Sequence, residues 1–111
     1  MNKLSIDDIV ESDDLKTELV EVPEWGGSVT IKELNAKEVE DFGITVNKSP
    51  GDALGLMCQL SIVNDDGTKM FHKNKIDQLI GKSHAALLRI FNAAMALSGL
   101  SDKAAEDIEK N

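Results

Sequence analysis

Three residues of this chain could support nucleophilic or acid–base chemistry at neutral pH, namely Cys58, His72 and His84, with several serines as weaker nucleophiles. A cysteine nucleophile reacts as the thiolate and is usually activated by a nearby histidine. Cys58, however, lies inside the apolar run Leu56–Leu60, where a cysteine is typically a small buried hydrophobe. We therefore expect Cys58 to be a packing residue. The competing hypothesis, a small hydrolase that uses Cys58 with a histidine, requires Cys58 to react with thiol reagents in the folded protein.

Metal and nucleotide sites are not predicted either. A zinc site needs about four ligands, typically as Cys or His pairs at short spacing, and this sequence has no such pair. Gly81–Ser83 resembles the end of a phosphate-binding P-loop, but the earlier glycine of that motif would have to replace Ile76. Asp65–Gly67 lacks the spaced acids of a calcium loop and predicts a turn. We therefore expect no catalytic, cofactor-binding or metal-binding residue, and no enzyme.

The charge of the chain excludes several classes of partner. Its 111 residues hold 12 Lys and Arg against 20 Asp and Glu, which gives a formal net charge of −8. Nucleic-acid binding relies on Lys and Arg, so this balance argues against it, and it also disfavours docking on anionic lipid. No apolar run approaches the roughly 20 residues of a membrane-spanning helix. An acidic N-terminal segment and a single cysteine predict a protein of the cytoplasm.

Two β-hairpins are predicted from apolar alternation around turn residues. The first joins strands at residues 17–22 and 28–32, and Pro23 ends its first strand because proline has no N–H to donate. The second joins Ser61–Val63 to Thr68–Phe71 through a turn that contains the Asp-Gly hairpin signal.

Three capping signals predict short helices before the last element, and a fourth, at the N-terminal end, predicts a single helical turn; each has a cap residue and a residue that suits the first turn. Glycine is expected to end two of them, because it readily adopts the left-handed conformation found after helices. The signals are Ser5 with Asp8, Asn35 with Glu38 ending at Gly43, Ser49 with Pro50, and Asn74 with Asp77 ending at Gly81.

The strongest element is a helix predicted over Ser83–Ser98, with Gly99 as its stop. Its apolar surface is wide, because the stripe of Leu87, Phe91, Ala94 and Met95 is flanked by Leu88 and Ile90. Such a surface indicates either a central core helix or a helix that also meets a partner. The only tryptophan, Trp25, lies in the first hairpin loop, where it either covers the core or binds a partner.

These elements predict one small α+β domain with an N-terminal hairpin, a second short hairpin and three to four helices, the longest at the C-terminal end. We expect a flexible acidic segment over residues 1–14, the domain over residues 15–100, and a flexible polar tail over residues 101–111.

The order of these segments resembles a known family. Seven segments together are similar to tail assembly chaperones of long-tailed, siphovirus-type phages and prophages, and they span roughly residues 17–100. They are Val20–Val29, Ile31–Leu34, Leu60–Gly67, Met70–Phe71, Lys82–Ser83, Leu87–Ala94 and Leu97–Leu100.

The resemblance implies a non-enzymatic protein of the infected bacterium's cytoplasm that is absent from the mature virion. Members of the family bind the tape-measure protein and keep it soluble until tail-tube subunits polymerise around it. Many also exist in a longer form, made by ribosomal frameshifting, whose extra domain recruits the tail-tube protein. Codons for Glu109–Asn111 can contain an A-rich slippery heptamer. The chain is also a candidate for self-association.

The last helix is the predicted client-binding element, because an apolar client helix needs an apolar groove. The residues chosen for partner contact are Leu88, Phe91 and Met95, with Trp25 and Leu100 as secondary candidates. The alternative function is an acidic inhibitor or antitoxin-like module that masks a basic surface, because residues 1–50 hold 12 acids and 5 bases. Salt distinguishes the two, since binding by an acidic mimic weakens steeply with ionic strength and binding in an apolar groove does not.

Overall fold

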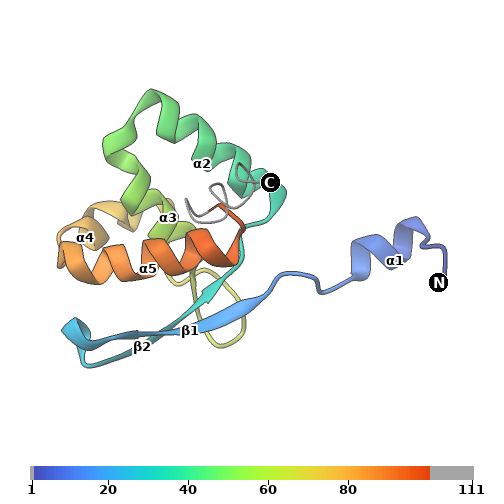
Figure 1. Cartoon of the computed structure of the whole chain (residues 1–111), viewed down its shortest axis with the longest axis horizontal. Helices are drawn as coiled ribbons and strands as arrows, with labels where there is room; N and C mark the ends of the chain where they lie inside the picture. Colours follow the sequence, from blue (N-terminus) through green and yellow to red (C-terminus); the bar gives the residue numbers. More distant parts are fainter. Residues whose placement is uncertain (1, 101–111) are drawn as a thin grey trace, which may run out of the picture.

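A computed structural model describes residues 2–100 of the chain. These residues form five α-helices and a three-stranded antiparallel sheet, which confirms the α+β class (Figure 1). The helix at the C-terminal end of the described chain is the longest, as the sequence predicts. The elements are α1 (Ile6–Glu11), β1 (Thr17–Val22), η1 (Pro23–Trp25), β2 (Gly27–Lys32), α2 (Ala36–Lys48), η2 (Pro50–Asp52), α3 (Ala53–Ser61), β3 (Ile62–Val63), η3 (Lys73–Lys75), α4 (Ile76–Ile80) and α5 (His84–Leu97).

The first predicted hairpin is present. Strands β1 and β2 pair along their whole lengths, from Thr17 opposite Lys32 to Val22 opposite Gly27. The connection is a short 3₁₀ turn that begins at Pro23 and ends at Gly26, whose φ of 71° lies in the left-handed region. The pairing places Val20 and Val22 on the face of the sheet that meets the core, in agreement with the sequence pattern.

The second predicted hairpin is present only in part. Ile62 and Val63 form β3, which pairs with β2 and so becomes the third strand of the same sheet. The predicted return strand Thr68–Phe71 is shorter than expected. The chain does turn back along β3, with a bridge between Lys69 and Val63 and backbone hydrogen bonds from Asn64 to Thr68 at 2.8 Å and from Met70 to Ile62 at 3.1 Å, but no continuous strand forms. The polar turn is nevertheless stable locally, since the N–H of Gly67 donates to the carbonyl of Asn64. The turn is therefore predicted correctly from its local residues. The pairing of Ile62 and Val63 with β2 is not predicted from the sequence.

Three predicted helix boundaries are also corrected. Helix α2 does not end at Gly43 but continues to Lys48, because Gly43 keeps a helical conformation and only Gly26, Gly67 and Gly99 of the described chain have positive φ. The side chain of Ser49 makes no capping bond, since a 3₁₀ turn starts at Pro50 and leads directly into α3. Asn74 is likewise no cap, because it lies inside the 3₁₀ turn that precedes α4.

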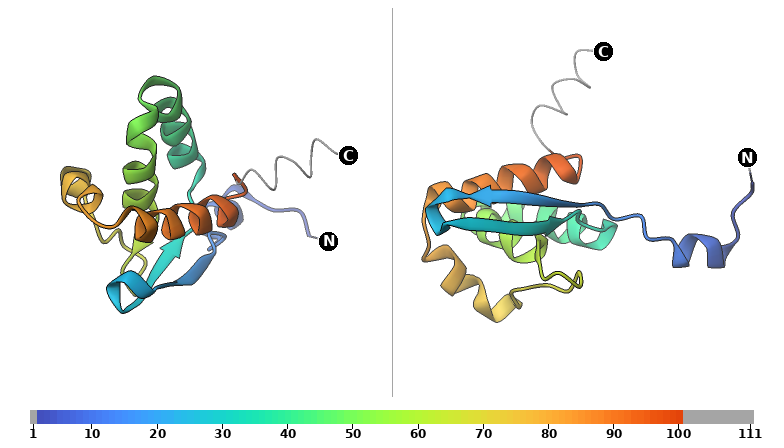
Figure 2. Two further views of the ribbon diagram at one scale, coloured as in Figure 1. Left: turned by 60° about the vertical axis from the view of Figure 1, so that its left-hand side comes forward. Right: turned by 90° about the horizontal axis from the view of Figure 1, so that it is seen from below.

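Helix α5 lies at the centre of the molecule, between the sheet and α3 (Figure 2). Its inner face buries Ala86, Leu87, Ile90 and Ala94 completely or almost so. These side chains pack with β1 and β2 on one side and with α3 on the other. The core-helix interpretation of the last helix is therefore correct for this face.

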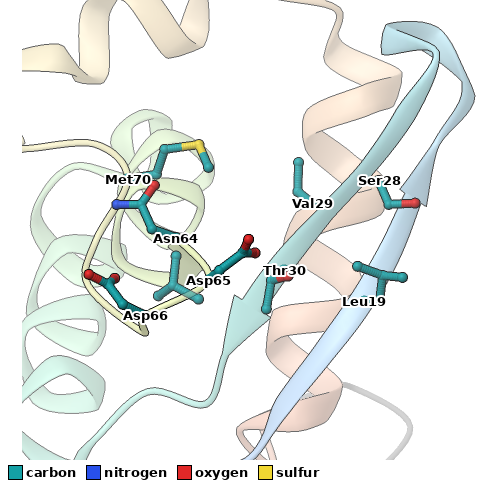
Figure 3. Close-up of a pocket in the computed structure, with 9 residues that line it drawn as sticks. Leu19, Ser28, Val29, Thr30, Asn64, Asp65, Asp66 and Met70 are labelled. Atoms are coloured by element: carbon teal, nitrogen blue, oxygen red, sulfur yellow. The ribbon is translucent and has the colours of Figure 1, made fainter.

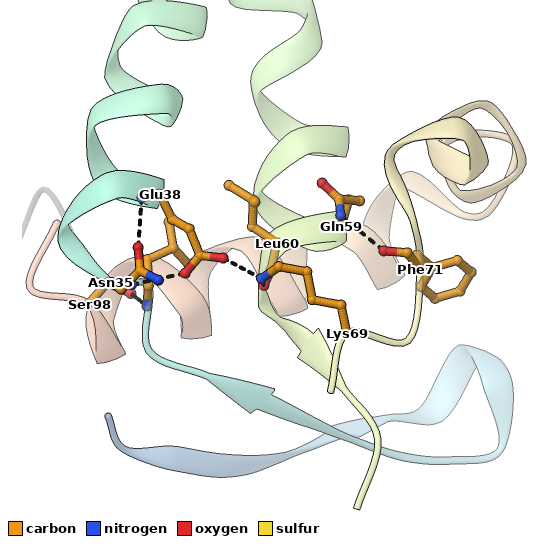
Figure 4. Close-up of polar contacts among 8 residues, drawn as sticks. Asn35, Glu38, Gln59, Leu60, Lys69, Phe71 and Ser98 are labelled. Carbon is orange, nitrogen blue, oxygen red and sulfur yellow. Dashed lines mark hydrogen bonds and ion pairs between the residues drawn. The ribbon is translucent and has the colours of Figure 1, made fainter. Parts of the chain in front are cut away.

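Polar contacts attach the loop after β3 to two of the helices (Figure 4). The ammonium of Lys69 pairs with the carboxylate of Glu38 and also donates to the carbonyl of Leu60, at 2.8 Å. The amide of Gln59 donates to the carbonyl of Phe71, at 2.9 Å. Together these contacts fasten the loop after β3 to α2 and α3.

Helix α1 stands apart from the rest of the chain at one end of the molecule (Figure 1). The predicted capping box is present, with the Ser5 hydroxyl accepting from the N–H of Asp8 and the Asp8 carboxylate accepting from the N–H of Ser5. None of its residues is buried. The division into segments 1–14, 15–100 and 101–111 stays a prediction, and the last of these segments lies outside the described residues.

Candidate functional site

The three principal partner residues predicted from the sequence share one flank of α5. Their spacing places Leu88, Phe91 and Met95 on successive turns of that side of the helix. Leu88 is 38% exposed, whereas Phe91 and Met95 are half-buried and pack against the core. The ring of Phe91 lies 6.1 Å from that of Phe42 on α2, in a tilted pair. The flank therefore offers one open apolar side chain and the edges of two others.

Leu100 joins this flank through the end of α5. The N–H of Leu100 donates to the carbonyl of Met95 at 2.7 Å, and the N–H of Gly99 donates to that of Ala96 at 3.2 Å. With Gly99 at a φ of 73°, these two bonds form a Schellman motif, which brings the residue after the glycine back onto the last turn. Met95 and Leu100 are thus held together by the backbone.

Trp25 reaches α5 from another direction. It belongs to η1, and its neighbour Glu24 binds the guanidinium of Arg89, with Arg89 Nε 3.0 Å from Glu24 Oε1. A hydrogen bond from its own backbone lowers the pKa of Glu24, and Arg89 lowers it further. Arg89 projects about 100° around the helix from Leu88. Trp25 is 38% exposed, and no hydrogen bond or ion pair of the described residues links it to the flank of Leu88.

Cys58 has the environment of a packing residue. It is fully buried, and its Sγ donates to the carbonyl of Leu87 at 3.5 Å. Desolvation raises the pKa of the Cys58 thiol to about 12, so the thiol stays protonated at neutral pH. His72 and His84 are both exposed. We expect thiol reagents to leave Cys58 unmodified in the folded protein.

A hollow that the sequence did not reveal lies beside β2 (Figure 3). Its volume is about 570 Å³, within the range of ligand-sized sites. One wall is formed by β1 and β2, and the other by the loop that follows β3. Its lining residues are Leu19, Ser28, Val29, Thr30, Val63, Asn64, Asp65, Asp66 and Met70. The two acids of the Asp-Asp-Gly turn are the one sequence feature that points to this hollow. The strand pairing that places the turn beside β2 is not evident from the sequence.

A second concave surface lies where α2, α3 and α4 meet. Two adjoining hollows there share Thr45, Leu56, Lys73 and Ile76 as lining residues. Ile44 lines one of the two hollows and Ile80 lines the other, and both are about half exposed. The sequence missed this surface because it ended α2 at Gly43, before Ile44.

Two further properties concern only the described part of the chain. Within residues 2–100, no three His, Cys, Asp or Glu side chains are arranged to hold a metal ion. None of the helices in the same range has the length and apolar character needed to cross a membrane.

Comparison with known proteins gives a match in structure but not in sequence. No family model matches the chain, and no curated protein matches it significantly. The solved structure of the bacteriophage HK97 tail assembly chaperone superposes with a TM-score of 0.65 at 17% sequence identity, over 83% of this chain and 91% of that one. The resemblance to tail assembly chaperones is therefore confirmed at the level of the fold: this chain has the fold of the HK97 tail assembly chaperone.

Proposed function

We propose that this chain is a phage or prophage tail assembly chaperone that binds the tape-measure protein and keeps it soluble while the tail tube forms. The observation that carries the proposal is the structural match to the HK97 tail assembly chaperone, which extends over most of both chains. A match over 83% of this chain and 91% of the other is not confined to one small substructure. Fold alone does not define function, which makes the client surface the part to test.

The proposed client surface is the outer flank of α5. It consists of Leu88, Phe91 and Met95, with Leu100 beside Met95 and Trp25 as a secondary contact. Exposed and half-buried apolar side chains along one helix suit an amphipathic client helix, whose apolar residues recur at similar spacing. The net charge of −8 would keep the loaded complex in solution, since net charge opposes aggregation.

The proposed setting follows from the same function. The protein would act in the cytoplasm of the host bacterium and be absent from the mature virion. A longer frameshifted form would bring the tail-tube protein to the complex, and the chain could also associate with itself. Sequencing the gene around the codons for Glu109–Asn111 tests for the slippery heptamer directly.

The first experiment is an affinity purification through a tag at the N-terminus, from cells that express the surrounding operon. Mass spectrometry should identify a long helical tail protein, with a longer form of this chain beside it. Recovery of a small basic protein without any tail component would contradict the proposal and favour the acidic-inhibitor alternative. Washing the complex at rising ionic strength separates the two further, because contacts between exposed charges are screened and apolar contacts are not.

A point variant then tests the client surface. Leu88→Asp places a charge on the open part of the flank and should abolish client recovery, while the circular dichroism spectrum stays that of the wild type. Ile44→Asp is the matched control, because Ile44 is also a partly exposed aliphatic residue but lies on α2. Loss of the helical spectrum in Leu88→Asp would instead identify Leu88 as a core residue. Equal loss of client binding in both variants would contradict a client surface on α5.

A further inference from the structure

Strand β2 has one edge that is only partly covered. Along its other edge it pairs with β1 at all six residues, from Gly27 to Lys32. On the free side β3 pairs only with Thr30 and Ile31, because β3 is two residues long and the chain then turns away. Within residues 2–100, no strand pairs with Gly27–Val29 on that side. A short stretch of extended backbone is therefore open to a further strand.

The hollow described above lies along this open stretch. Ser28, Val29 and Thr30 form its wall on β2, and the loop carrying Asn64, Asp65 and Met70 faces them across the open space (Figure 3). The register places Leu19, Thr30 and Val63 on one face of the sheet, because Leu19 lies opposite Thr30 and Thr30 opposite Val63. Leu19 is 67% exposed and Met70 45% exposed. The hollow thus combines an unpaired strand edge with exposed apolar side chains.

The two exposed edges of the sheet differ in their protection. Proteins commonly guard an edge strand with charged side chains, which discourage another strand from pairing with it. The free edge of β1 carries Glu18 and Glu21 within its six residues. The open stretch of β2 consists of Gly27, Ser28 and Val29 and carries no charge. Of the two edges, the open stretch beside the hollow is the one without charged side chains.

The charged residues that line the hollow favour one type of partner. Asp65 and Asp66 line it, and no Lys, Arg or His is among its lining residues. The hydroxyl and the N–H of Thr68 both donate to the carboxylate of Asp66, and these bonds lower the pKa of Asp66. Asp66 therefore remains ionised at neutral pH. A basic side chain that enters the hollow would be attracted, and an acidic one repelled.

We propose that this hollow binds a short extended segment of a partner protein, which adds to β2 as a strand in line with β3 and carries alternating apolar and basic residues. Main-chain hydrogen bonds to β2 would supply part of the affinity, as in other cases of strand addition. Alternate side chains would contact Leu19 and Met70, and a Lys or Arg would lie beside Asp65 and Asp66. This inference does not rest on the chaperone proposal, because it concerns a different surface from the flank of α5.

The test uses the full chain and a synthetic probe, a blocked peptide of about eight alternating Lys and Val residues, a usual strand length. Two control peptides carry Glu in place of Lys, or Pro at alternate positions. Amide chemical shifts are followed by NMR as each peptide is added up to about 1 mM. The Lys–Val peptide should shift Gly27–Thr30, Asn64–Asp66 and Met70, and should show cross-strand NOEs to β2. The Glu peptide should not bind, and the Pro peptide should bind at least about tenfold more weakly, because it cannot complete a ladder.

A charge-reversal variant tests the site itself. The side chain of Asp65 makes no hydrogen bond to any of residues 2–100. Asp65→Lys should weaken binding of the Lys–Val peptide by about tenfold, since 1.4 kcal/mol corresponds to that factor. Asp14→Lys changes the net charge equally but lies in the segment before β1, and should leave binding unchanged. The proposal is overturned by an absence of shifts, by shifts centred on another surface, or by equal effects of the two variants. Concentration-dependent shifts of Gly27–Val29 without peptide would also overturn it, because a second copy would then be the occupant.

Discussion

Helices α1 and α5 begin in the same way and have opposite surroundings. Each starts at a serine whose hydroxyl accepts a backbone N–H, from Asp8 to Ser5 in α1 and from Ala86 to Ser83 in α5. Each also carries several aliphatic residues. In α5 four of these side chains are buried, whereas in α1 none is. Local capping signals therefore start both helices, but only α5 packs its apolar side chains into the core of the domain.

The difference comes from what surrounds each helix. The sheet covers one side of α5 and α3 covers another, so its apolar side chains are removed from water on both sides. Helix α1 precedes an extended segment and has no neighbour among the described residues that buries it. Short isolated helices gain little stability from their own hydrogen bonds. We therefore expect substitutions in α5 to change the stability of the whole domain, and those in α1 to change α1 alone.

The largest expected effect compares two isoleucines. Ile90→Ala removes a fully buried side chain of α5 and should lower the free energy of unfolding by about 3 kcal/mol, because it leaves a cavity in the core. Ile9→Ala removes the same atoms from a residue that is 58% exposed, and should change that free energy by less than about 0.5 kcal/mol. Urea denaturation followed by circular dichroism measures both. A large loss in Ile9→Ala would mean that α1 packs against another surface in solution.

The next comparison uses two helical glycines. A Cβ at Gly55 of α3 would lie 2.7 Å from Cγ2 of Ile80 and 3.1 Å from Cγ2 of Ile76, so α3 and α4 approach closely at this point. Gly55→Ala should destabilise the domain by about 1 kcal/mol, because overpacking outweighs the better helix propensity of alanine. Apart from its chain neighbours and the backbone of its own helix, a Cβ at Gly43 meets no atom of residues 2–100 within 4 Å, so Gly43→Ala should stabilise the domain by up to about 1 kcal/mol.

Thermal denaturation compares the stabilities of the two glycine variants. A second substitution then tests whether the contact with Ile80 causes the loss of stability in Gly55→Ala. Ile80→Leu moves the branch away from Cβ and so removes the atom nearest to the new methyl group. Because Ile80 is about half exposed, this change alone should be nearly neutral. The double variant of Gly55→Ala with Ile80→Leu should recover most of the lost stability. If it does not, the cost of Gly55→Ala arises somewhere other than the α3–α4 contact.

The elements that the sequence predicted well are those fixed by local chemistry. The first hairpin, the capping boxes at Ser5 and Asn35 and the ends of α5 all depend on residues within a few positions of one another. Gly43 shows the limit of such signals. A glycine often ends a helix but does not have to, and α2 continues through it to Lys48.

The errors and omissions involve residues distant in the sequence. The pairing of Ile62 and Val63 with β2 joins segments about thirty residues apart, and neither hairpin signal contains it. The hollow beside β2 exists only because of that pairing, so it too was missed. On α5 the apolar stripe was predicted, but its division into a buried face and the flank of Leu88 depends on where the sheet and α3 lie.

A smaller effect compares the two capping serines. Ser83→Ala removes the acceptor for the N–H of Ala86 and should lower the free energy of unfolding by about 1 kcal/mol, a usual cost for losing an N-cap. Ser5→Ala removes the equivalent acceptor in α1 and should leave the urea transition unchanged. Its effect should appear instead as a loss of helical Cα chemical shifts over residues 6–11. Equal shifts of the urea midpoint in both variants would contradict the view that α1 is independent of the core.

The smallest expected effect is a pH dependence confined to α1. The backbone N–H of Ser5, and then its hydroxyl, lower the pKa of Asp8 below its ordinary value of 3.8. Because the pKa is lower in the folded helix than in the unfolded chain, the ionised carboxylate stabilises α1 above about pH 4, and this contribution is lost as the pH falls through the folded-state pKa. Helix α5 has no acidic residue in its first turn.

Cα chemical shifts recorded from neutral to acidic pH should therefore show α1 losing helicity before α5 does. Asp8→Asn removes the titrating group and should give an α1 whose residual helicity varies much less with pH. Simultaneous loss of both helices would mean that global acid unfolding, and not the Ser5–Asp8 capping box, governs α1. If α1 instead stayed helical after α5 had unfolded, α1 would need a partner that the isolated domain does not provide, because a short helix gains little stability from its own hydrogen bonds.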